Sequence, residues 1–519
     1  MMTPVLRTPV LVVGAGTVGS VLALELAHHD VPSIVVDRAY APRRDPELNL
    51  VDGRSMELLR RLGLAAAIRR YGIDPDCATD MVWSQGLDQP PVLVSQLPSV
   101  NQLRGTYAAI HDGSTPVEPY LSLSGARLAG QLRDAVRAHP LIDLREGWTF
   151  TGLRIEPGGT VATALEAGTG ARHVVEARYL AGCDGGQSTV RRCLDVPMEQ
   201  LKTPAHHYSV YFRSADLSRR SRRTRPSTII VDGMTLVSRD EQDIWIGHLP
   251  VGPDEVVPTD PVAALRGRLG IGLEPPQVLG VTEWDDSLAV AATYRRGPAY
   301  LVGDSAHQFH PAGGNADTGI ADAVDLGWKL AAAINGWGGP ALLGSYELER
   351  RPRALMDREL LARTLETRRR FGRLAAAGAP REFLAGVLRQ EAPQTDATGL
   401  GGRHATSSVI WHEPGGPAAA GARLPAVRLS GGTQLFDRLG RQFTLIDLTD
   451  EAGGRPLAAA AGERGIPMTY LRITDAVLRE RWDRCLVLVR PDQYVAWRAG
   501  TAPRDWNAVL DVVTGNKTT

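Results

Sequence analysis

The stretch PVLVVGAGTVGSVLALELAHHDVPSIVVDR, residues 9–38, decides the fold of the N-terminal part of the chain. Two runs of β-branched apolar residues flank a segment whose apolar residues recur every three or four positions. This pattern predicts a strand, a helix and a second strand. Such a βαβ unit is typical of the start of a doubly wound α/β domain.

The turn between the first strand and the helix carries Gly14, Gly16 and Gly19 in the pattern GxGxxG. The first glycine permits a tight turn, the second lets a pyrophosphate approach the backbone, and the third lets the helix pack against the strand. Asp37 ends the second strand about twenty residues later, where a carboxylate binds the ribose of an adenosine group. Together these residues predict a dinucleotide-binding site.

Composition narrows the class of protein and of partner. Of the 519 residues, 43% are hydrophobic and 22% are charged, and the formal net charge is zero. A chain of this length needs several cores, and a neutral chain has no overall field that attracts nucleic acid or an anionic membrane. No apolar run approaches the roughly eighteen residues of a membrane span, and the N-terminus leads directly into the glycine turn. We therefore expect a cytoplasmic protein that acts on a small molecule as a monomer or homodimer.

The four cysteines indicate neither a disulfide framework nor a zinc site. Cys77, Cys183, Cys193 and Cys485 lack CxxC spacing and a histidine-rich neighbourhood. This pattern fits a reducing compartment. We expect no bound metal ion.

Two later segments repeat the arrangement of a strand followed by a polar turn and a helix. ARYLAGCDGGQSTVRRCL, residues 177–194, places Asp184 after a strand, which by itself indicates an ordinary strand-to-helix turn. YLVGDSAHQFHPAGGNADTG, residues 300–319, places Gly303 and Asp304 after another strand, where a carboxylate can bind ribityl hydroxyls. Backbone N–H groups at the start of the helix that follows can hold an anion or a polarised oxygen.

Taken in this order, the three segments resemble those of the group A FAD-dependent monooxygenases, in particular the aromatic-polyketide and phenol-hydroxylase-like enzymes with a thioredoxin-like C-terminal domain. The resemblance extends over the whole chain. It includes RSMELLRRLGL (54–64), GWKLA (327–331), YELERRP (346–352) and LVRPDQYVAWR (488–498).

The resemblance implies an α/β fold with a Rossmann-like FAD-binding domain, an inserted β-sheet substrate domain and a C-terminal thioredoxin-like domain. Strand-like segments rich in aromatic residues begin after residue 195, and a region rich in Pro, Gly and Ala follows the long helical patterns. The C-terminal unit lacks CxxC, so we expect no redox role for it. The expected boundaries are 1–195 and 286–390 for a discontinuous FAD-binding domain, 196–285 for the sheet domain, 391–425 for a linker and 426–519 for the thioredoxin-like domain.

The implied activity is hydroxylation or another oxidative tailoring of a polycyclic or phenolic polyketide-type intermediate, as in antibiotic biosynthesis. FAD would be the cofactor, and NAD(P)H and O2 would be consumed. The expected cofactor-binding residues are Gly14, Gly16, Gly19, Asp37, Arg38, Arg54, Asp184, Gly303, Asp304, Gly313, Gly314 and Asn315.

The sequence does not assign catalytic residues. His307, His310 and Pro311 are candidates because they flank the third turn, although a histidine there mostly has a packing role in the family. Aromatic residues of the middle sheet are candidates for the substrate pocket, and they are equally compatible with an ordinary core. They are Tyr208, Tyr211, Trp245 and Trp284.

The third segment departs from the family pattern. Residues 311–319 read PAGGNADTG, one residue shorter than the family's loop, with Ala316 or Asp317 where a second loop glycine is usual. A carboxylate on Asp317 near flavin N1 would oppose the negative charge of reduced flavin; alternatively, Asp317 or Thr318 caps the helix. Two other positions that usually touch the flavin also differ, with Glu47 in place of an arginine and Ser124 or Gly125 in place of a glutamine or arginine.

These departures leave two further functions open. The first is a redox-neutral cyclase of the decalin-forming, Diels–Alder type known from spirotetronate-like pathways, in which FAD is structural and the pocket holds a reactive conformer. The second is a flavin-binding protein without catalytic activity whose C-terminal unit docks a carrier. The identity of the substrate and the choice between NADH and NADPH stay open.

Overall fold

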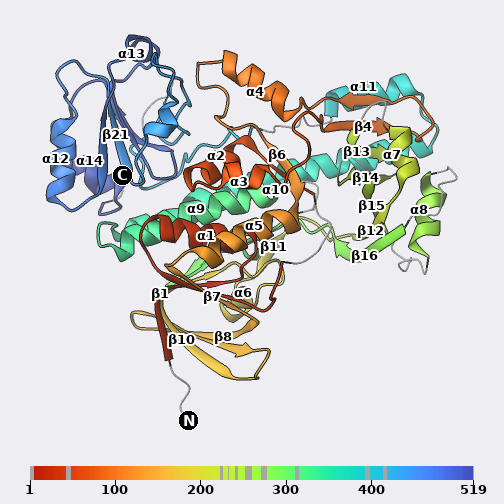
Figure 1. Ribbon diagram of the computed structural model, residues 1–519, viewed down its shortest axis with the longest axis horizontal. Coiled ribbons are helices and arrows are strands. Elements are labelled where there is room, and N and C mark those ends of the chain that lie inside the picture. The colour runs from red at the N-terminus through yellow and green to blue at the C-terminus, as the bar shows by residue number, and fades with distance from the viewer. Residues whose placement is uncertain are drawn as a thin grey trace.

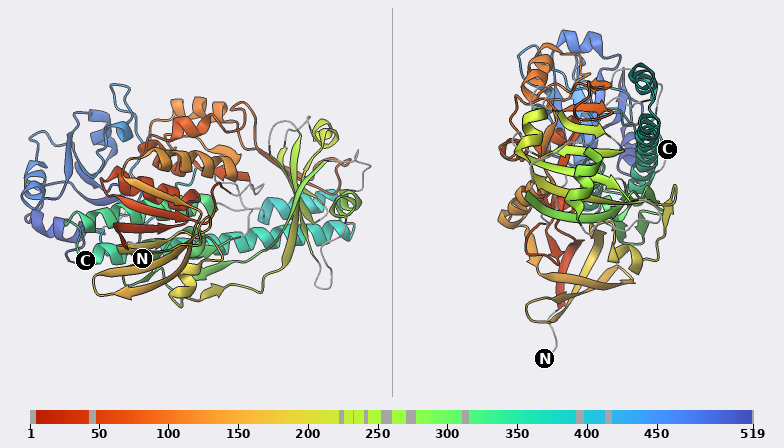
Figure 2. Two further views of the ribbon diagram at one scale, coloured as in Figure 1. Left: turned by 60° about the horizontal axis from the view of Figure 1, so that its bottom comes forward. Right: turned by 90° about the vertical axis from the view of Figure 1, so that its right-hand side faces the viewer.

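The computed structural model describes residues 5–42, 48–221, 226–231, 233–239, 243–251, 260–269, 277–309, 315–391, 398–412 and 418–517. Figures 1 and 2 show an N-terminal unit built around a mainly parallel sheet, a second sheet at one end, and a C-terminal unit at the other end. This arrangement agrees with the expected α/β class. Among the described helices, none combines the length and the apolar character needed to cross a membrane.

The first sheet has the order β18-β19-β10-β1-β2-β7, and β1 pairs in parallel with both β10 and β2. The second half of β1 and most of β2 are apolar and buried, as expected for a parallel sheet covered on both faces. A hairpin of β8 and β9 extends it along β10. Its strands are β1 (Val5–Val13), β2 (Ser33–Asp37), β7 (Ile142–Glu146), β8 (Trp148–Glu156), β9 (Gly159–Glu166), β10 (Arg172–Gly182), β18 (Arg295–Arg296) and β19 (Ala299–Leu301).

Helices and short strands complete the N-terminal unit, and α1, α5 and α9 pack near one another above the sheet (Figure 1). The helices are α1 (Thr17–His28), α2 (Gly53–Arg61), α3 (Ala65–Arg69), α4 (Val100–Ala109), α5 (Gly125–Ala138), α6 (Thr189–Cys193), η1 (Gly303–Ser305), α9 (Asn315–Ile334) and α10 (Pro340–Ala376). The short strands are β3 (Leu48–Val51), β6 (Leu121–Ser124), β11 (Met198–Gln200), β17 (Ala289–Ala291) and β20 (His307–Gln308).

The second sheet has the order β16-β12-β15-β14-β13-β4-β5. Two of its strands come from within residues 1–195, because β4 pairs in parallel with β13. The sheet is therefore not confined to the predicted segment 196–285. Its elements are β4 (Asp80–Ser84), β5 (Leu93–Ser95), β12 (His206–Arg213), β13 (Pro226–Val231), β14 (Met234–Ser238), β15 (Ile244–Pro250), β16 (Gln277–Asp285), α7 (Ala215–Ser221), α8 (Pro261–Leu269) and α11 (Arg381–Glu391).

The C-terminal unit has a sheet of order β22-β21-β23-β24, in which only β22 and β21 are parallel. The preceding segment, predicted as a linker, also contributes to the core, because Val409 and Ile410 are fully buried against this unit. The elements are η2 (Leu435–Arg438), β21 (Phe443–Asp447), α12 (Arg455–Glu463), β22 (Met468–Arg472), α13 (Ala476–Arg481), β23 (Leu486–Val489), β24 (Val495–Ala499) and α14 (Trp506–Val513).

A buried ion network joins the C-terminal unit to α9 and α10. Arg490, which follows β23, donates to Glu349 of α10 at 2.8 Å and to Asp325 of α9 at 2.9 Å. Lys329 of α9 donates to the same two carboxylates at 2.9 and 2.8 Å. Burial alone would raise the pKa of Glu349, but Arg490 and Lys329 hold that pKa well below its ordinary value. The network is therefore a set of mutually compensated charges.

The same cluster has the spacing of a metal site. Ligand atoms of Asp325, Glu349, His404 and Asp492 lie within 4.8 Å of one another, and all four residues are buried. Arg490 pairs with all three carboxylates and Lys329 with two of them, and burial raises the pKa of Asp325 well above its ordinary value. Two cations therefore face three carboxylates, one of which is disposed to hold a proton, and these contacts account for the cluster as an ion network.

Replacing Arg490 by methionine should destabilise the protein strongly. The change removes the cation and leaves the buried carboxylates of Glu349 and Asp325 short of one positive charge, which costs about 3–5 kcal/mol. Urea denaturation measures the free energy of unfolding. As the control, Arg441→Met removes a largely exposed arginine, which forms a 3.7 Å ion pair with Asp30; its effect should stay below about 0.5 kcal/mol. Equal stabilities for the two variants would contradict the role given to the network.

Candidate functional site

The turns after β1, β10 and β19 meet at one edge of the first sheet. The Cys183 amide donates to the Val13 carbonyl at 2.8 Å, and the Val302 amide donates to the Gly182 carbonyl at 3.0 Å. The Ser305 hydroxyl also donates to the Gly182 carbonyl, at 2.5 Å. The carboxyl ends of the parallel strands therefore bring the three predicted turns together, in the place where open α/β sheets bind ligands.

The glycine-rich turn contains two glycines that the fold requires, Gly14 and Gly19, and one that it does not, Gly16. Gly14 has a φ of +104°, and an added Cβ would lie 2.4 Å from the Cys183 carbonyl oxygen. A Cβ on Gly19 would lie 1.9 Å from the Gly14 carbonyl oxygen. A Cβ on Gly16, the residue that precedes α1, would meet no protein atom within 4 Å. The open space at the start of α1 fits the approach of a pyrophosphate.

Asp37 lies at the end of β2, beside this turn. One carboxylate oxygen accepts the Ala15 amide at 2.6 Å and the other accepts the Ala39 amide at 2.7 Å. Each oxygen has a further lone pair for a ribose hydroxyl. The next residue, Arg38, is exposed. Asp37 thus fits the predicted role and also holds the turn in place.

Asp184 has a local structural function. Its carboxylate accepts the Ser188 hydroxyl at 2.5 Å and the Thr189 and Val190 amides at 2.6 and 3.0 Å. These contacts cap the start of α6 and give the strand-to-helix turn that the segment indicates on its own. The oxygen that accepts only the Ser188 hydroxyl keeps a lone pair, so the cap is compatible with the predicted cofactor contact.

The third turn brings the start of α9 close to the start of α1. Gly303 has a φ of +64°, and a Cβ there would lie 2.8 Å from a methyl group of Val18. A Cβ on Gly319, in the first turns of α9, would lie 2.6 Å from the same methyl group. Asp304 is exposed between these elements, within reach of a ligand. The two glycines thus allow η1 and α9 to approach the dinucleotide edge.

His307 belongs to a buried ion cluster rather than to an open site. Its Nε2 lies 2.9 Å from Asp322, whose other oxygen accepts a hydrogen bond from Arg350 at 2.6 Å. The ring stacks on Phe309. This environment gives His307 a positioning role. Four other predicted residues, His310, Pro311, Gly313 and Gly314, lie outside the described residues, and Asn315 is described only as the first residue of α9.

Asp317, the unusual residue of the altered loop, is paired with Asp52 at the start of α2. The Asp52 amide donates to the Asp317 carboxylate at 3.0 Å, and the Asp52 carboxylate accepts the Ser55 amide at 2.7 Å. Burial raises the pKa of Asp52 to about 6. Burial and the nearby Asp52 raise the pKa of Asp317 well above its ordinary value. Asp317 therefore links α9 to α2, and its surroundings favour the protonated form more than those of an ordinary aspartate do.

Arg54, a predicted cofactor contact, is directed to the C-terminal unit. It donates to the Gln493 side chain at 2.6 Å and to the Asp492 carbonyl, and its guanidinium lies 5.4 Å from the centre of the Tyr494 ring. The motif around Arg54 therefore joins two units of the fold. Arg54 also pairs with Glu57 on the same helix at 3.1 Å, but its partners in the C-terminal unit lie more than 400 residues away in sequence, so no local pattern indicates them.

The aromatic candidates of the second sheet divide between its two faces. Tyr208 and Trp245 are buried in a core that includes Leu217 of α7 and Leu265 of α8. The Trp245 indole donates to Ser218 at 2.8 Å. These two residues are therefore core residues and not pocket residues, because they face the outer helices.

Tyr211 and Trp284 lie on the opposite face, which is turned towards α10 and the first sheet (Figure 2). The Trp284 indole donates to the Ser209 hydroxyl at 2.8 Å, and its ring stacks on His207 with the centroids 4.4 Å apart. The sequence did not indicate three further candidates on or beside this face, which are Ser209, His248 and Arg368. The apolar residues Tyr208, Val210 and Phe212 recur at every second position of β12 and would have placed Ser209 on the opposite face. Nothing local indicates Arg368, which comes from α10.

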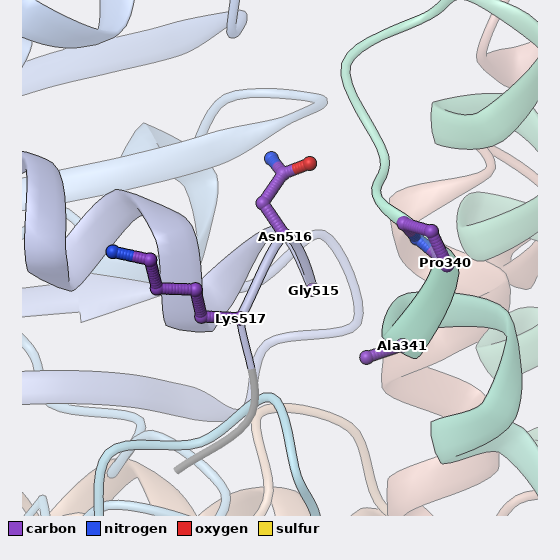
Figure 3. A pocket seen from close by; sticks show the side chains of 5 residues that line it. All are labelled: Pro340, Ala341, Gly515, Asn516 and Lys517. Carbon is purple, nitrogen blue, oxygen red and sulfur yellow. The ribbon is translucent and has the colours of Figure 1, made fainter.

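An open depression lies away from these turns, where the start of α10 meets the last described residues of the chain (Figure 3). It is lined by Pro340, Ala341, Gly515, Asn516 and Lys517. Its backbone is tied by hydrogen bonds from Gly339 to Thr514 and from Ala341 to Gly515. None of the predicted site residues lines it, so it is not a candidate for the active site.

Comparison with known proteins places the chain among flavin-dependent enzymes. The chain is 31% identical to the FAD-dependent monooxygenase apdD of Emericella nidulans, over 94% of this chain and 87% of that one. It is 30% identical to the tetracenomycin A2 monooxygenase-dioxygenase of Streptomyces glaucescens, over 95% and 93% of the two chains. It is also 29% identical to the dialkyldecalin synthase of Streptomyces rugosporus, over 94% and 96%.

A solved structure shares the whole architecture. The rebeccamycin biosynthetic enzyme RebC with reduced flavin is 29% identical and superposes with a TM-score of 0.87 over 99% of this chain and 100% of that one. The family profile described as FAD binding domain matches residues 7–357, and that described as aromatic-ring hydroxylase, C-terminal, matches residues 418–516. The chain therefore belongs to the family of FAD-dependent monooxygenases that carry an aromatic-ring hydroxylase C-terminal domain.

Proposed function

We propose that the protein uses FAD, a nicotinamide reductant and O2 to insert one oxygen atom into a polycyclic or phenolic polyketide-type intermediate. The observation that carries the proposal is the convergence of three turns at the edge of a parallel sheet, beside a second sheet that presents Tyr211 and Trp284. The relatives named above include enzymes of this reaction class. The proposal includes a small-molecule partner, a cytoplasmic location and a monomeric or homodimeric state.

The cofactor contacts are proposed from the fit of the edge to a dinucleotide. The amides at the start of α1, next to Gly16, would hold the pyrophosphate, and Asp37 would bind the ribose. Asp304 would bind the ribityl chain, and the start of α9 would hold the polar edge of the ring. When bound, FAD supplies the oxygen-transfer chemistry, and the protein supplies orientation and the exclusion of water.

The altered loop is compatible with redox chemistry because the raised pKa of Asp317 favours its neutral form. A carboxyl with a raised pKa opposes nearby negative charge less than an ordinary aspartate does, and it remains a hydrogen-bonding group. The unusual residue therefore does not by itself exclude a reduced flavin at this site.

The redox-neutral cyclase stays as the second candidate. The observation that favours it is the pairing of Asp317 with Asp52, which alters the loop at the start of α9, together with the similarity to a dialkyldecalin synthase. The larger number of monooxygenases among the relatives favours oxygen insertion. The family assignment argues against a flavin-binding protein without catalytic activity.

The central test follows the flavin in the absence of oxygen. Anaerobic holoenzyme is mixed with NADPH or NADH, with and without hydroxylated anthraquinones as candidate substrates, and the flavin absorbance is recorded. We expect bleaching that a substrate accelerates and, after ¹⁸O2 is admitted, one labelled oxygen atom in the product. Turnover of a polyene substrate with the flavin held oxidised, and no NAD(P)H consumption with any quinone, would favour the cyclase instead.

The glycine turn offers a test that separates cofactor binding from folding. Gly16→Ala should leave the fold intact, because its Cβ meets no protein atom, and weaken FAD binding at least about tenfold, or about 1.4 kcal/mol. Gly19→Ala should lose folded protein, because its Cβ clashes with the Gly14 carbonyl. The control Gly105→Ala lies in α4 with open space around it and should preserve both properties. FAD titration and thermal unfolding measure the two effects. Unchanged FAD affinity in Gly16→Ala would remove Gly16 from the site.

The Asp52–Asp317 pair predicts a pH-dependent stability. Because the folded-state pKa of both groups is raised, with Asp52 at about 6, the folded state binds their protons more tightly than the unfolded state. This contribution is fully present below about pH 4 and is lost as the pH rises through 6. Asp317→Asn keeps the acceptor for the Asp52 amide and cannot ionise. The unfolding free energy of Asp317→Asn minus that of the wild type should therefore become more positive by about 1–2 kcal/mol as the pH rises from 5 to 8.

Thermal and urea unfolding of both proteins across this pH range measure the difference. Asp134→Asn removes an exposed carboxylate of α5 and serves as the control, because it should change stability equally at both pH values. Parallel stability curves for the wild type and Asp317→Asn would show that the pair does not hold a proton.

A further inference from the structure

A chain of hydrogen bonds crosses the face of the second sheet that is turned towards α10. The Trp284 indole donates to the Ser209 hydroxyl at 2.8 Å, and Ser209 lies 2.7 Å from His248 Nδ1. The three residues come from three adjacent strands, β16, β12 and β15. Backbone pairing in the sheet therefore fixes their relative positions.

This chain favours one of the two neutral forms of His248. An indole N–H can only donate, so Ser209 accepts from Trp284, and we assign the Ser209 hydroxyl proton to His248 Nδ1, the arrangement in which Ser209 both accepts and donates along the chain. Nδ1 is then the acceptor, and the proton lies on Nε2. Among the described residues, none hydrogen-bonds to Nε2. Burial, aided by the cations Arg368 and Arg239 and by His207, lowers the pKa of His248 to about 3, so the neutral form is the one present.

Arg368 of α10 approaches the same histidine. Its neighbours on the helix have acidic partners, since Arg369 pairs with Asp286 at 2.5 Å and Arg370 with Glu391. In the part of the chain that the structure describes, no group accepts a hydrogen bond from Arg368 or forms an ion pair with it, and its Nε is buried without a partner. Burial lowers the pKa of Arg368 to about 10, so the guanidinium stays charged at neutral pH.

A half-buried guanidinium without an acceptor is costly unless a ligand supplies one. Here the His248 ring stands edge-on to Trp284, whose indole stacks on His207, and the charge of Arg368 acts on the same histidine. These groups match an aromatic molecule that carries a negatively charged oxygen. Two donors, one of them charged, are the usual way in which proteins hold such an oxygen.

We propose that Arg368 and His248 bind an anionic oxygen of the substrate, so that the substrate is an aromatic compound with an ionised carboxyl, phenolic or enolic group. The inference rests on the proposed function in that the ligand is the molecule to be oxidised. An ionised phenolic or enolic oxygen also donates electron density to the ring, which favours attack by an electrophilic oxygen atom. Arg368 and His248 thus select the substrate and, in the phenolic case, hold it in its reactive ionised form.

Binding of three probes to the FAD-loaded enzyme tests the proposal without turnover. Anthraquinone-2-carboxylate and 2-hydroxyanthraquinone carry the two kinds of ionisable oxygen, and anthraquinone-2-carboxamide is the neutral control. Dissociation constants come from the change in the flavin spectrum or fluorescence. The wild type should bind at least one ionised probe at least about tenfold more tightly than the carboxamide.

Arg368→Met should raise the dissociation constant of the preferred ionised probe about 30-fold or more and change that of the carboxamide by less than about threefold. Arg368→Lys keeps the charge, should retain part of the preference, and covers the case in which the methionine variant does not fold. Arg373→Met is the matched control, because Arg373 is an exposed arginine of the same helix. His248→Leu should lose part of the preference, and His248→Gln, which retains an N–H donor, should restore some of it.

The hydroxyl probe gives a second readout. Its ionised form has a distinct visible band, which should appear at a lower pH when the probe is bound to the wild type than when it is free, and which Arg368→Met should return towards the free value. If the carboxamide binds the wild type as tightly as both ionised probes, or if Arg368→Met weakens all three equally, the proposal is wrong. A preference for an ionised probe without any NAD(P)H-dependent oxidation would support this inference and contradict the monooxygenase proposal.

Discussion

The buried ion network around Glu349 and Arg490 is the constraint on which the positions of the other elements depend. It holds α9, α10 and the C-terminal unit together through charges that cannot be left unpaired in the interior. Asp322, one helical turn before Asp325 on α9, and Arg350, next to Glu349 on α10, extend it to the third turn through His307. Contacts made in the middle of α9 and in the first part of α10 therefore help to position the start of α9 and the distal part of α10.

The dinucleotide edge was predictable from sequence because its determinants are local. Gly14, Gly16, Gly19 and Asp37 lie within one βαβ unit; backbone geometry explains Gly14 and Gly19, and open space for a ligand explains Gly16. Asp184 shows the limit of such reasoning. A carboxylate after a strand can bind a ligand, cap the next helix or do both, and only the position of the Ser188 hydroxyl and the following amides reveals the cap.

Other features depend on contacts between distant segments. Arg54 lies in a family-like motif, but its partners are in the C-terminal unit, and β4 joins the second sheet from far upstream. The two faces of β12 could have been separated by the alternation of side chains, which places Tyr208 opposite Tyr211. The sequence could not show which face is turned inwards, because that depends on where α7, α8 and α10 pack.

The length of α10 has a consequence for recombination between relatives. At 37 residues the helix is about 55 Å long, and it carries Glu349 near one end and Phe371, which packs on Trp83 of β4, near the other. A chimera that exchanged only residues 196–285 would separate the transplanted strands from β4 and from the helix that lines their inner face. The natural unit of exchange is discontinuous, and its crossover points lie before β4 and in the middle of a single helix.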